Sequence, residues 1–122
     1  MGKIDVVFYI TADGKEPALD FLDSLDRKMR AKMVRTIGLL QDNGTELREP
    51  MSKPLGDGIF ELRAQMGNNI SRVLYFFFVG NKAILTNGFV KKTRKTPDNE
   101  IERAKRYRTD FLERMKKGHD EF

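Results

Sequence analysis

The fold of this chain is decided by residues 59–89, which read IFELRAQMGNNISRVLYFFFVGNKAILTNGF. Three runs rich in β-branched and aromatic residues, at 59–65, 70–79 and 82–89, are separated by two short turn signals that contain Gly and Asn. Apolar runs that alternate with Gly-Asn turns are typical of antiparallel hairpins. We therefore expect a three-stranded antiparallel meander whose central, most apolar strand is covered on both faces.

The two hairpin turns also determine which residues face one another. If the Gly-Asn pairs at residues 67–68 and 80–81 form the tips, Arg63 lies directly opposite Arg72, and Arg72 lies opposite Phe89. Like charges in directly opposed positions destabilise a sheet. A pair of facing arginines therefore predicts that an anionic group belongs between the two guanidinium groups.

One strand pattern and two helical patterns precede the meander. Residues 3–10 alternate weakly and predict a first strand, and Pro17 is well placed to open a helix. A second helix, capped by Ser24 or Asp26, ends at the Asn-Gly pair of residues 43–44. Its apolar face, at helical spacing, is expected to contain Met29, Met33, Ile37 and Leu40. We expect the two helices to form a hairpin that packs on the sheet.

The remaining segments complete the predicted order. Residues 47–58 contain two prolines and two glycines without periodicity and predict a loop. Thr96 as N-cap and Pro97 at the first helical position predict the start of the last helix. The order β-α-α-β-β-β-α is typical of an α+β domain with a mostly antiparallel sheet. The chain has 122 residues, and we expect one domain over 1–118 and a frayed tail at 119–122.

Positive charge is concentrated in one part of the chain. The net charge is +5, and residues 88–117 contain eleven of the 23 Lys and Arg residues but five of the 18 Asp and Glu residues. This segment therefore carries the entire positive excess. Such sorting predicts a surface that faces a polyanion, most simply nucleic acid. A solvated basic helix or a site for an acidic partner protein are the alternatives.

Several common catalytic sets are missing from the sequence. The chain has no Cys, which excludes disulfides, thiolate zinc sites and Cys nucleophiles. Its one histidine, His119, lies in the predicted tail, which argues against a Ser-His-Asp arrangement. Asp20, Asp23 and Asp26 straddle a predicted helix boundary, where capping explains them better than a metal ion does. We see no signal peptide and no membrane span, so we expect a cytoplasmic protein.

The chemistry that the sequence offers is cationic. Guanidinium groups bind phosphate oxygens in bidentate fashion, and fixed cations stabilise a pentacoordinate phosphate without a metal. RNA supplies its own nucleophile, the 2′-hydroxyl, so that the protein needs a base, which Glu61 or a lysine could be, and an acid. The predicted catalytic residues are Arg63, Arg72, Lys92 and Glu61, and the predicted RNA-binding residues are Lys53, Lys91, Arg94 and Lys95.

Structural interpretations exist for the same residues. Arg63 could form a surface ion pair with Glu61, and Arg72 could form a buried salt bridge. The aromatic run at residues 75–78 is more typical of a core strand than of a surface that stacks on bases. Tyr107 fits either interpretation.

Four segments carry a resemblance to a known family, namely KPLGDGIFELR (53–63), RVLYFFF (72–78), GFVKKTRKTP (88–97) and EIERA (100–104). In this order and spacing they resemble the RelE superfamily of toxins in its phage-related, HigB-type branch. The resemblance implies a microbial RNase fold that cleaves messenger RNA in the ribosomal A site without a metal or other cofactor. It also implies an antitoxin, usually a helix-turn-helix DNA-binding protein. By position, Arg63, Arg72 and Lys92 match cations that cleave RNA in the superfamily.

Two features depart from the family pattern. Pro97 and Asp98 occupy the region where the type member has a catalytic tyrosine, and Glu61 stands where it has a lysine. The identity of the general base is therefore open. Two other functions stay as alternatives to RNA cleavage. One is a ParE-like toxin that blocks gyrase, and the other is a nucleic-acid-binding accessory protein of a mobile element.

Overall fold

A computed structural model describes residues 3–91 and 95–118 of the chain. Within these residues, five strands form one sheet in the order β1-β5-β4-β3-β2, and three α-helices pack on it. Strand β1 is parallel to β5, and the other neighbours are antiparallel. The α+β class is thus confirmed. The elements are β1 (Asp5–Phe8), α1 (Pro17–Ser24), α2 (Arg27–Asn43), the 3-10 turn η1 (Gly44–Glu46), β2 (Ser52–Gly56), β3 (Ile59–Met66), β4 (Asn69–Phe78), β5 (Lys82–Lys91) and α3 (Asp98–Lys116).

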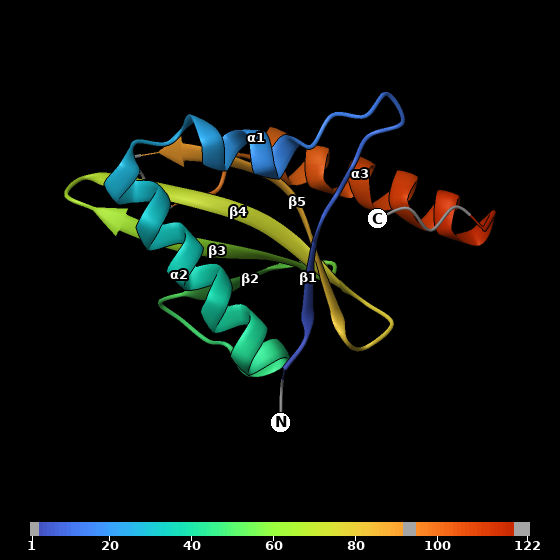
Figure 1. The fold of residues 1–122 in the computed structure, drawn as a ribbon, viewed down its shortest axis with the longest axis horizontal. Helices are drawn as coiled ribbons and strands as arrows, with labels where there is room; N and C mark the ends of the chain where they lie inside the picture. The colour runs from blue at the N-terminus through green and yellow to red at the C-terminus, as the bar shows by residue number, and fades with distance from the viewer. Residues whose placement is uncertain (1–2, 92–94, 119–122) are drawn as a thin grey trace.

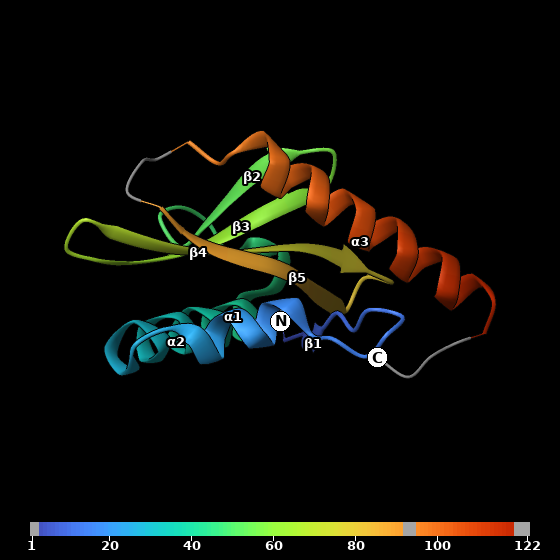
Figure 2. The same cartoon turned by 90° about the horizontal axis from the view of Figure 1, so that it is seen from above.

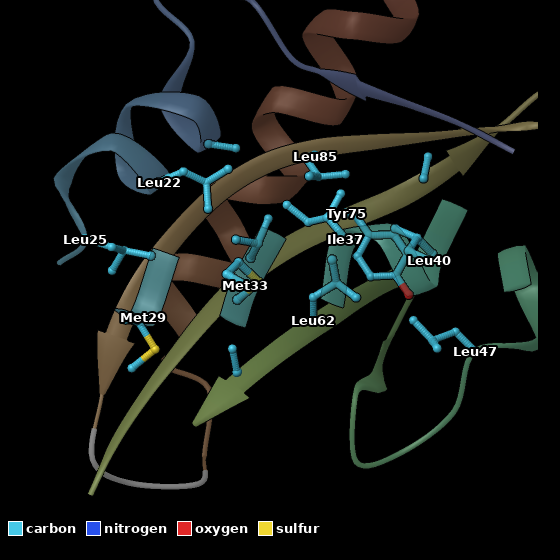
Figure 3. Close-up of a cluster of buried hydrophobic side chains, with 14 residues drawn as sticks. Leu22, Leu25, Met29, Met33, Ile37, Leu40, Leu47, Leu62, Tyr75 and Leu85 are labelled. Atoms are coloured by element: carbon cyan, nitrogen blue, oxygen red, sulfur yellow. The ribbon is translucent and has the colours of Figure 1, made fainter. Parts of the chain in front are cut away.

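The molecule has three layers, with the sheet in the middle. Figure 2 shows α1 and α2 together on one face of the sheet and α3 on the other. The core between the helical hairpin and the sheet is drawn in Figure 3, where the predicted apolar face of α2 meets Leu62, Tyr75 and Leu85. A second core, which includes Leu74 and Phe111, lies between the sheet and α3. The central strand is covered on both faces, as its apolar run predicts.

The helical hairpin forms as the sequence indicates. Pro17 is the first residue of α1, and Asp26 is the N-cap of α2, where its carboxylate accepts a hydrogen bond of 2.8 Å from the Met29 N–H. Helix α2 ends at Asn43, and its C-cap residue Gly44 has a φ of 56°, which suits a residue without a side chain. The four residues that we expected on the apolar face of α2 are all buried.

The prediction of a loop over residues 47–58 was wrong in its second half. Strand β2 occupies Ser52–Gly56 and pairs with β3 at the edge of the sheet, with Lys53 opposite Glu61. Proline is tolerated in an edge strand because its missing N–H would point away from the sheet. Pro54 and the neighbouring glycines therefore concealed a strand that carries one of the predicted RNA-binding lysines.

The predicted register of the arginines is confirmed. Arg63 lies opposite Arg72, and Arg72 lies opposite Phe89. The second hairpin reaches this register by a different route, because its loop has three residues rather than two. A bulge between Leu74 and Tyr75 shifts the pairing by one residue and compensates for the longer loop.

Close packing of α1 on β5 depends on Gly88. A methyl group at this position would overlap the Phe21 ring and would lie 2.8 Å from its Cε2 atom. We expect Gly88→Ala to lower the free energy of unfolding by about 1–3 kcal/mol, the usual range for overpacking. Urea unfolding measures the loss. Gly38→Ala, which has open space around the new methyl group, is the control and should not be destabilised.

Helix α3 is hydrogen-bonded to Tyr9, the residue that directly follows β1. The Tyr9 hydroxyl donates a 2.5 Å hydrogen bond to Asp110. Burial of Tyr9, the hydrogen bond to Asp110 and the charge of Asp110 together raise the pKa of this phenol well above its usual range. Because the folded state holds the neutral phenol, its contribution is complete below the unfolded pKa of about 10 and is lost as the pH rises above it.

We therefore expect the free energy of unfolding to fall as the pH is raised from 9 to 11. The measurement is urea unfolding at several pH values in this range. Tyr9→Phe should make the fall shallower and leave the contribution of Tyr75, whose pKa burial also raises. An unchanged slope in Tyr9→Phe would show that Tyr9 ionises as freely in the folded state as in the unfolded chain.

Candidate functional site

Glu61 is the centre of the candidate site. It projects from β3 toward the α3 side of the sheet, and its side chain is fully buried. Its Oε2 atom accepts a hydrogen bond from Arg63 Nε and lies 3.7 Å from Arg72 Nε. The register explains this arrangement, because opposed residues 63 and 72 project on the same face and Glu61 lies two residues from Arg63. The anion expected between the facing arginines is therefore supplied by the protein itself.

Arg72 is fully buried, and its position is set by several groups. Its Nη1 atom donates a 3.1 Å hydrogen bond to the carbonyl of Lys95, and its guanidinium lies 5.8 Å from the ring centre of Phe89. Burial lowers the pKa of Arg72, the charge of Glu61 opposes that effect, and the charge of Arg63 adds to it. Two guanidinium groups share one carboxylate, so these three side chains together carry one excess positive charge.

Thr96 is a site residue that the sequence did not reveal. We expected it to cap the last helix, but Pro97 occupies the N-cap position and α3 begins at Asp98. The Thr96 hydroxyl instead donates to Glu61 Oε1, and the residue is buried. A Thr-Pro pair before a helix has the pattern of a cap, and nothing local indicates a partner on a strand 35 residues away.

Two lysines line a hollow above this buried cluster, which we call the lysine hollow. Lys53 of β2 and Lys95, just before α3, form it together with Thr96, Asp98 and Ile101. Its volume is about 460 Å³, within the ~300–1,000 Å³ common for ligand sites. Glu61, Arg63, Arg72 and Thr96 form a buried group that we call the Glu61 cluster. Thr96 also belongs to the wall of the hollow, so this residue connects the surface lysines with the buried arginines.

Of the other predicted site residues, Lys91 lies within the part of the chain that the structure describes. Lys91 is exposed at the end of β5, two residues beyond Phe89 and opposite Ile70. Figure 1 shows that the C-terminal end of β5, the β3–β4 hairpin and the junction of α1 and α2 share one end of the sheet. Lys92 and Arg94 are outside the described residues.

The surroundings of Glu61 do not match its predicted role as a general base. Glu61 was a candidate for the general base, but its carboxylate is inaccessible from solvent, and each of its two oxygens accepts a hydrogen bond. A base must reach the proton that it removes. The geometry fits a carboxylate that orients Arg63, Arg72 and Thr96. The two structural interpretations are present in the same cluster, since Arg63 pairs with Glu61 and Arg72 is a buried cation beside it.

Other predicted features proved to be structural. Tyr75 and Phe76 are core residues, and Tyr107 stacks on Tyr9 with 4.7 Å between the ring centres. Among residues 3–91 and 95–118, no group of His, Cys, Asp or Glu side chains could hold a metal ion. His119 falls outside that part of the chain. None of the helices within it has both the length and the apolar content that crossing a bilayer demands.

A comparison with known protein families shows to which family the chain belongs. The model of the phage-derived Gp49-like protein family (DUF891) matches residues 20–109. The chain belongs to the Gp49-like family. This family includes RelE-like toxins of toxin–antitoxin systems, and membership in a toxin-like family implies an antitoxin partner. The matched region includes the Glu61 cluster and both lysines of the hollow. A search of curated proteins found no match.

Proposed function

We propose that this Gp49-like protein is the toxin of a toxin–antitoxin pair and that it cleaves messenger RNA on the ribosome without a metal. The observation that carries the proposal is the convergence of Arg63 and Arg72 on Glu61 directly beside the lysine hollow. A cluster with excess positive charge next to a lysine-lined hollow suits a phosphodiester. The family relationship supports the same class of protein.

The proposed reaction uses the 2′-hydroxyl of RNA as its nucleophile. A base removes the hydroxyl proton, the oxygen attacks the adjacent phosphorus, and the bond to the 5′ oxygen breaks as an acid protonates the leaving oxygen. The products are a 2′,3′-cyclic phosphate and a 5′-hydroxyl. Fixed cations stabilise the charge of the pentacoordinate transition state and need no reorganisation during the reaction. No other reactant is required.

The residues divide into those that touch RNA and those that position them. In this proposal Arg63, whose side chain is 16% exposed, contacts the scissile phosphate, and Lys53 and Lys95 contact the phosphates around it. Arg72 is a positioning residue, because it is fully buried and holds the Lys95 carbonyl. In this proposal Lys92 is the acid, Lys91 and Arg94 hold the RNA strand, and a lysine of the hollow is the base.

The proposal is tested by inducing the chain in bacteria and mapping the 5′ ends of transcripts. Growth should stop within minutes, translated messengers should show new ends, and co-expression of a helix-turn-helix antitoxin should restore both. Arrest with intact messengers and broken chromosomal DNA would indicate a ParE-like gyrase poison instead. Unimpaired growth would favour a non-toxic accessory protein.

A further inference from the structure

A second hollow is lined in part by Arg63, and we call it the helix groove. It has a volume of about 350 Å³ and is formed by α2, the segment before β2, β3 and β4. Its existence follows from the short edge strand, because pairing between β2 and β3 begins at Ser52 and Leu62. Beyond that point the edge of β3 has no neighbouring strand within the described sheet, and α2 forms the opposite wall.

The helix groove has cations around an apolar floor. Lys32, Arg35 and Arg63 supply the positive charge, and Leu39, Met51 and Ile70 contribute apolar surface. None of its lining residues is acidic. An apolar surface bordered by cations suits a nucleotide, because a base can lie on the apolar floor while its phosphate contacts the rim.

Arg63 connects the helix groove with the lysine hollow. Arg63 is one of the residues that line the groove, and its Nε donates to Glu61, which in turn accepts from Thr96 in the wall of the lysine hollow. Each of the two hollows therefore shares a residue with the same buried cluster, Arg63 in the groove and Thr96 in the lysine hollow. A strand of RNA with its scissile phosphate at Arg63 would extend on one side toward the lysines and on the other toward α2.

We propose that the helix groove binds the nucleotide adjacent to the scissile phosphate, with Lys32 and Arg35 as ligands of its backbone. This inference rests on the proposed function and names where the substrate strand continues. The groove positions the RNA and contributes to the choice of cleavage site, since the base on its floor is the one that the protein can distinguish.

An acidic polypeptide is the rival occupant, and one contact disfavours it. An extended peptide would bind by adding a strand to the free edge of β3. Lys32 Nζ donates a 2.8 Å hydrogen bond to the Gln65 carbonyl on that edge, so the position that an added strand needs is already occupied. The same contact holds the Lys32 ammonium group at the rim of the groove, where a phosphate can bind to it.

The test compares two double variants with the same loss of charge. Lys32→Ala with Arg35→Ala removes the two groove cations that α2 supplies, whereas Arg27→Ala with Lys28→Ala removes two exposed cations from the first turn of the same helix. Arg35→Ala alone covers the case in which loss of the Lys32 contact disturbs folding. The probes are a fluorescent single-stranded RNA hexamer, measured by anisotropy, and cleavage of a messenger on programmed ribosomes.

The groove variant should bind the hexamer about tenfold more weakly, with a salt dependence reduced by about 0.7 for each lost phosphate contact. Its KM for cleavage should rise while kcat stays near that of the unaltered protein, and the control variant should change neither. Equal losses in both variants would overturn the inference, because they would reflect general electrostatics. Unchanged RNA binding with lost binding of a polyglutamate peptide would overturn it in favour of an acidic polypeptide.

The hexamer also separates this inference from the proposed function, because binding is measured without cleavage. If the unaltered protein cleaves no messenger but the groove variant alone loses RNA affinity, the function fails and the groove stands as an RNA site. If cleavage is normal in the unaltered protein and in the groove variant, with equal KM, the groove inference fails and the function stands.

Discussion

Glu61→Gln is expected to lower the free energy of unfolding by about 3–5 kcal/mol, because the change removes one partner of a buried charge cluster and leaves the others uncompensated. The amide keeps the size of the side chain but removes its charge. Arg72 is fully buried, Arg63 is 16% exposed, and both converge on this carboxylate. Water therefore cannot replace the lost interaction at Arg72.

Urea unfolding of Glu61→Gln beside Asp57→Asn measures this effect. Asp57 also pairs with a cation, Lys105 at 2.9 Å, but its side chain is 71% exposed, so its loss should be much smaller. Similar losses in the two variants would show that the Glu61 charge is not what holds the arginines together.

A double variant separates the structural role of Glu61 from its role in positioning. Glu61→Gln combined with Arg72→Met removes the carboxylate and its buried cation together, and such replacements of buried charges are often neutral for stability. We expect the double variant to recover most of the stability that Glu61→Gln loses. Cleavage should not recover, because neither Arg63 nor the Lys95 carbonyl is then held in place. Recovery of cleavage would assign the cluster a purely structural role.

Arg63→Ala is expected to lower the rate of messenger cleavage by about a hundredfold, the usual cost of removing one stabiliser of transition-state charge. Arg63 is the partly exposed arginine of the buried cluster and lines the helix groove. Arg63→Lys should retain only part of the activity, since an ammonium group cannot make the bidentate contact of a guanidinium.

Cleavage of a programmed messenger, measured at saturating toxin, gives these rates. Arg103→Ala is the matched control, because Arg103 is 42% exposed on α3 and pairs with Glu100 rather than with the cluster. A folded Arg63→Ala protein that cleaves at the rate of the control would remove Arg63 from the catalytic residues.

The sequence predicts most of the sheet because its hairpin signals are local. Alternating strand patterns and Gly-Asn turns specify antiparallel neighbours, and from these the opposition of Arg63 and Arg72 follows directly. In the second hairpin, the predicted register at Arg72 is correct although the predicted loop length is not. The sequence does not reveal the bulge beside Leu74, and the register at Arg72 agrees with the prediction because bulge and longer loop compensate.

What the sequence did not reveal depends on tertiary contacts. Strand β2 exists because β3 offers it an edge, whereas its own Pro54 and Gly56 indicate a loop. The Thr96 bond to Glu61 and the burial of that carboxylate depend on how α3 approaches the sheet. The sequence therefore did not show that the Glu61 carboxylate is shielded from solvent and accepts a hydrogen bond at each oxygen. The helix groove likewise needs the place where β2 ends, which no local pattern provides.

The most direct test of RNA cleavage at the Glu61 cluster is the chemistry of the cut end. Programmed ribosomes are incubated with the purified protein, and the messenger carries a single 2′-deoxynucleotide just 5′ of a mapped cleavage position. We predict that the unmodified messenger is cut to a 2′,3′-cyclic phosphate and that the deoxy-substituted messenger stays intact at that position. Cleavage of the deoxy-substituted messenger, or an uncut natural messenger, would contradict the account.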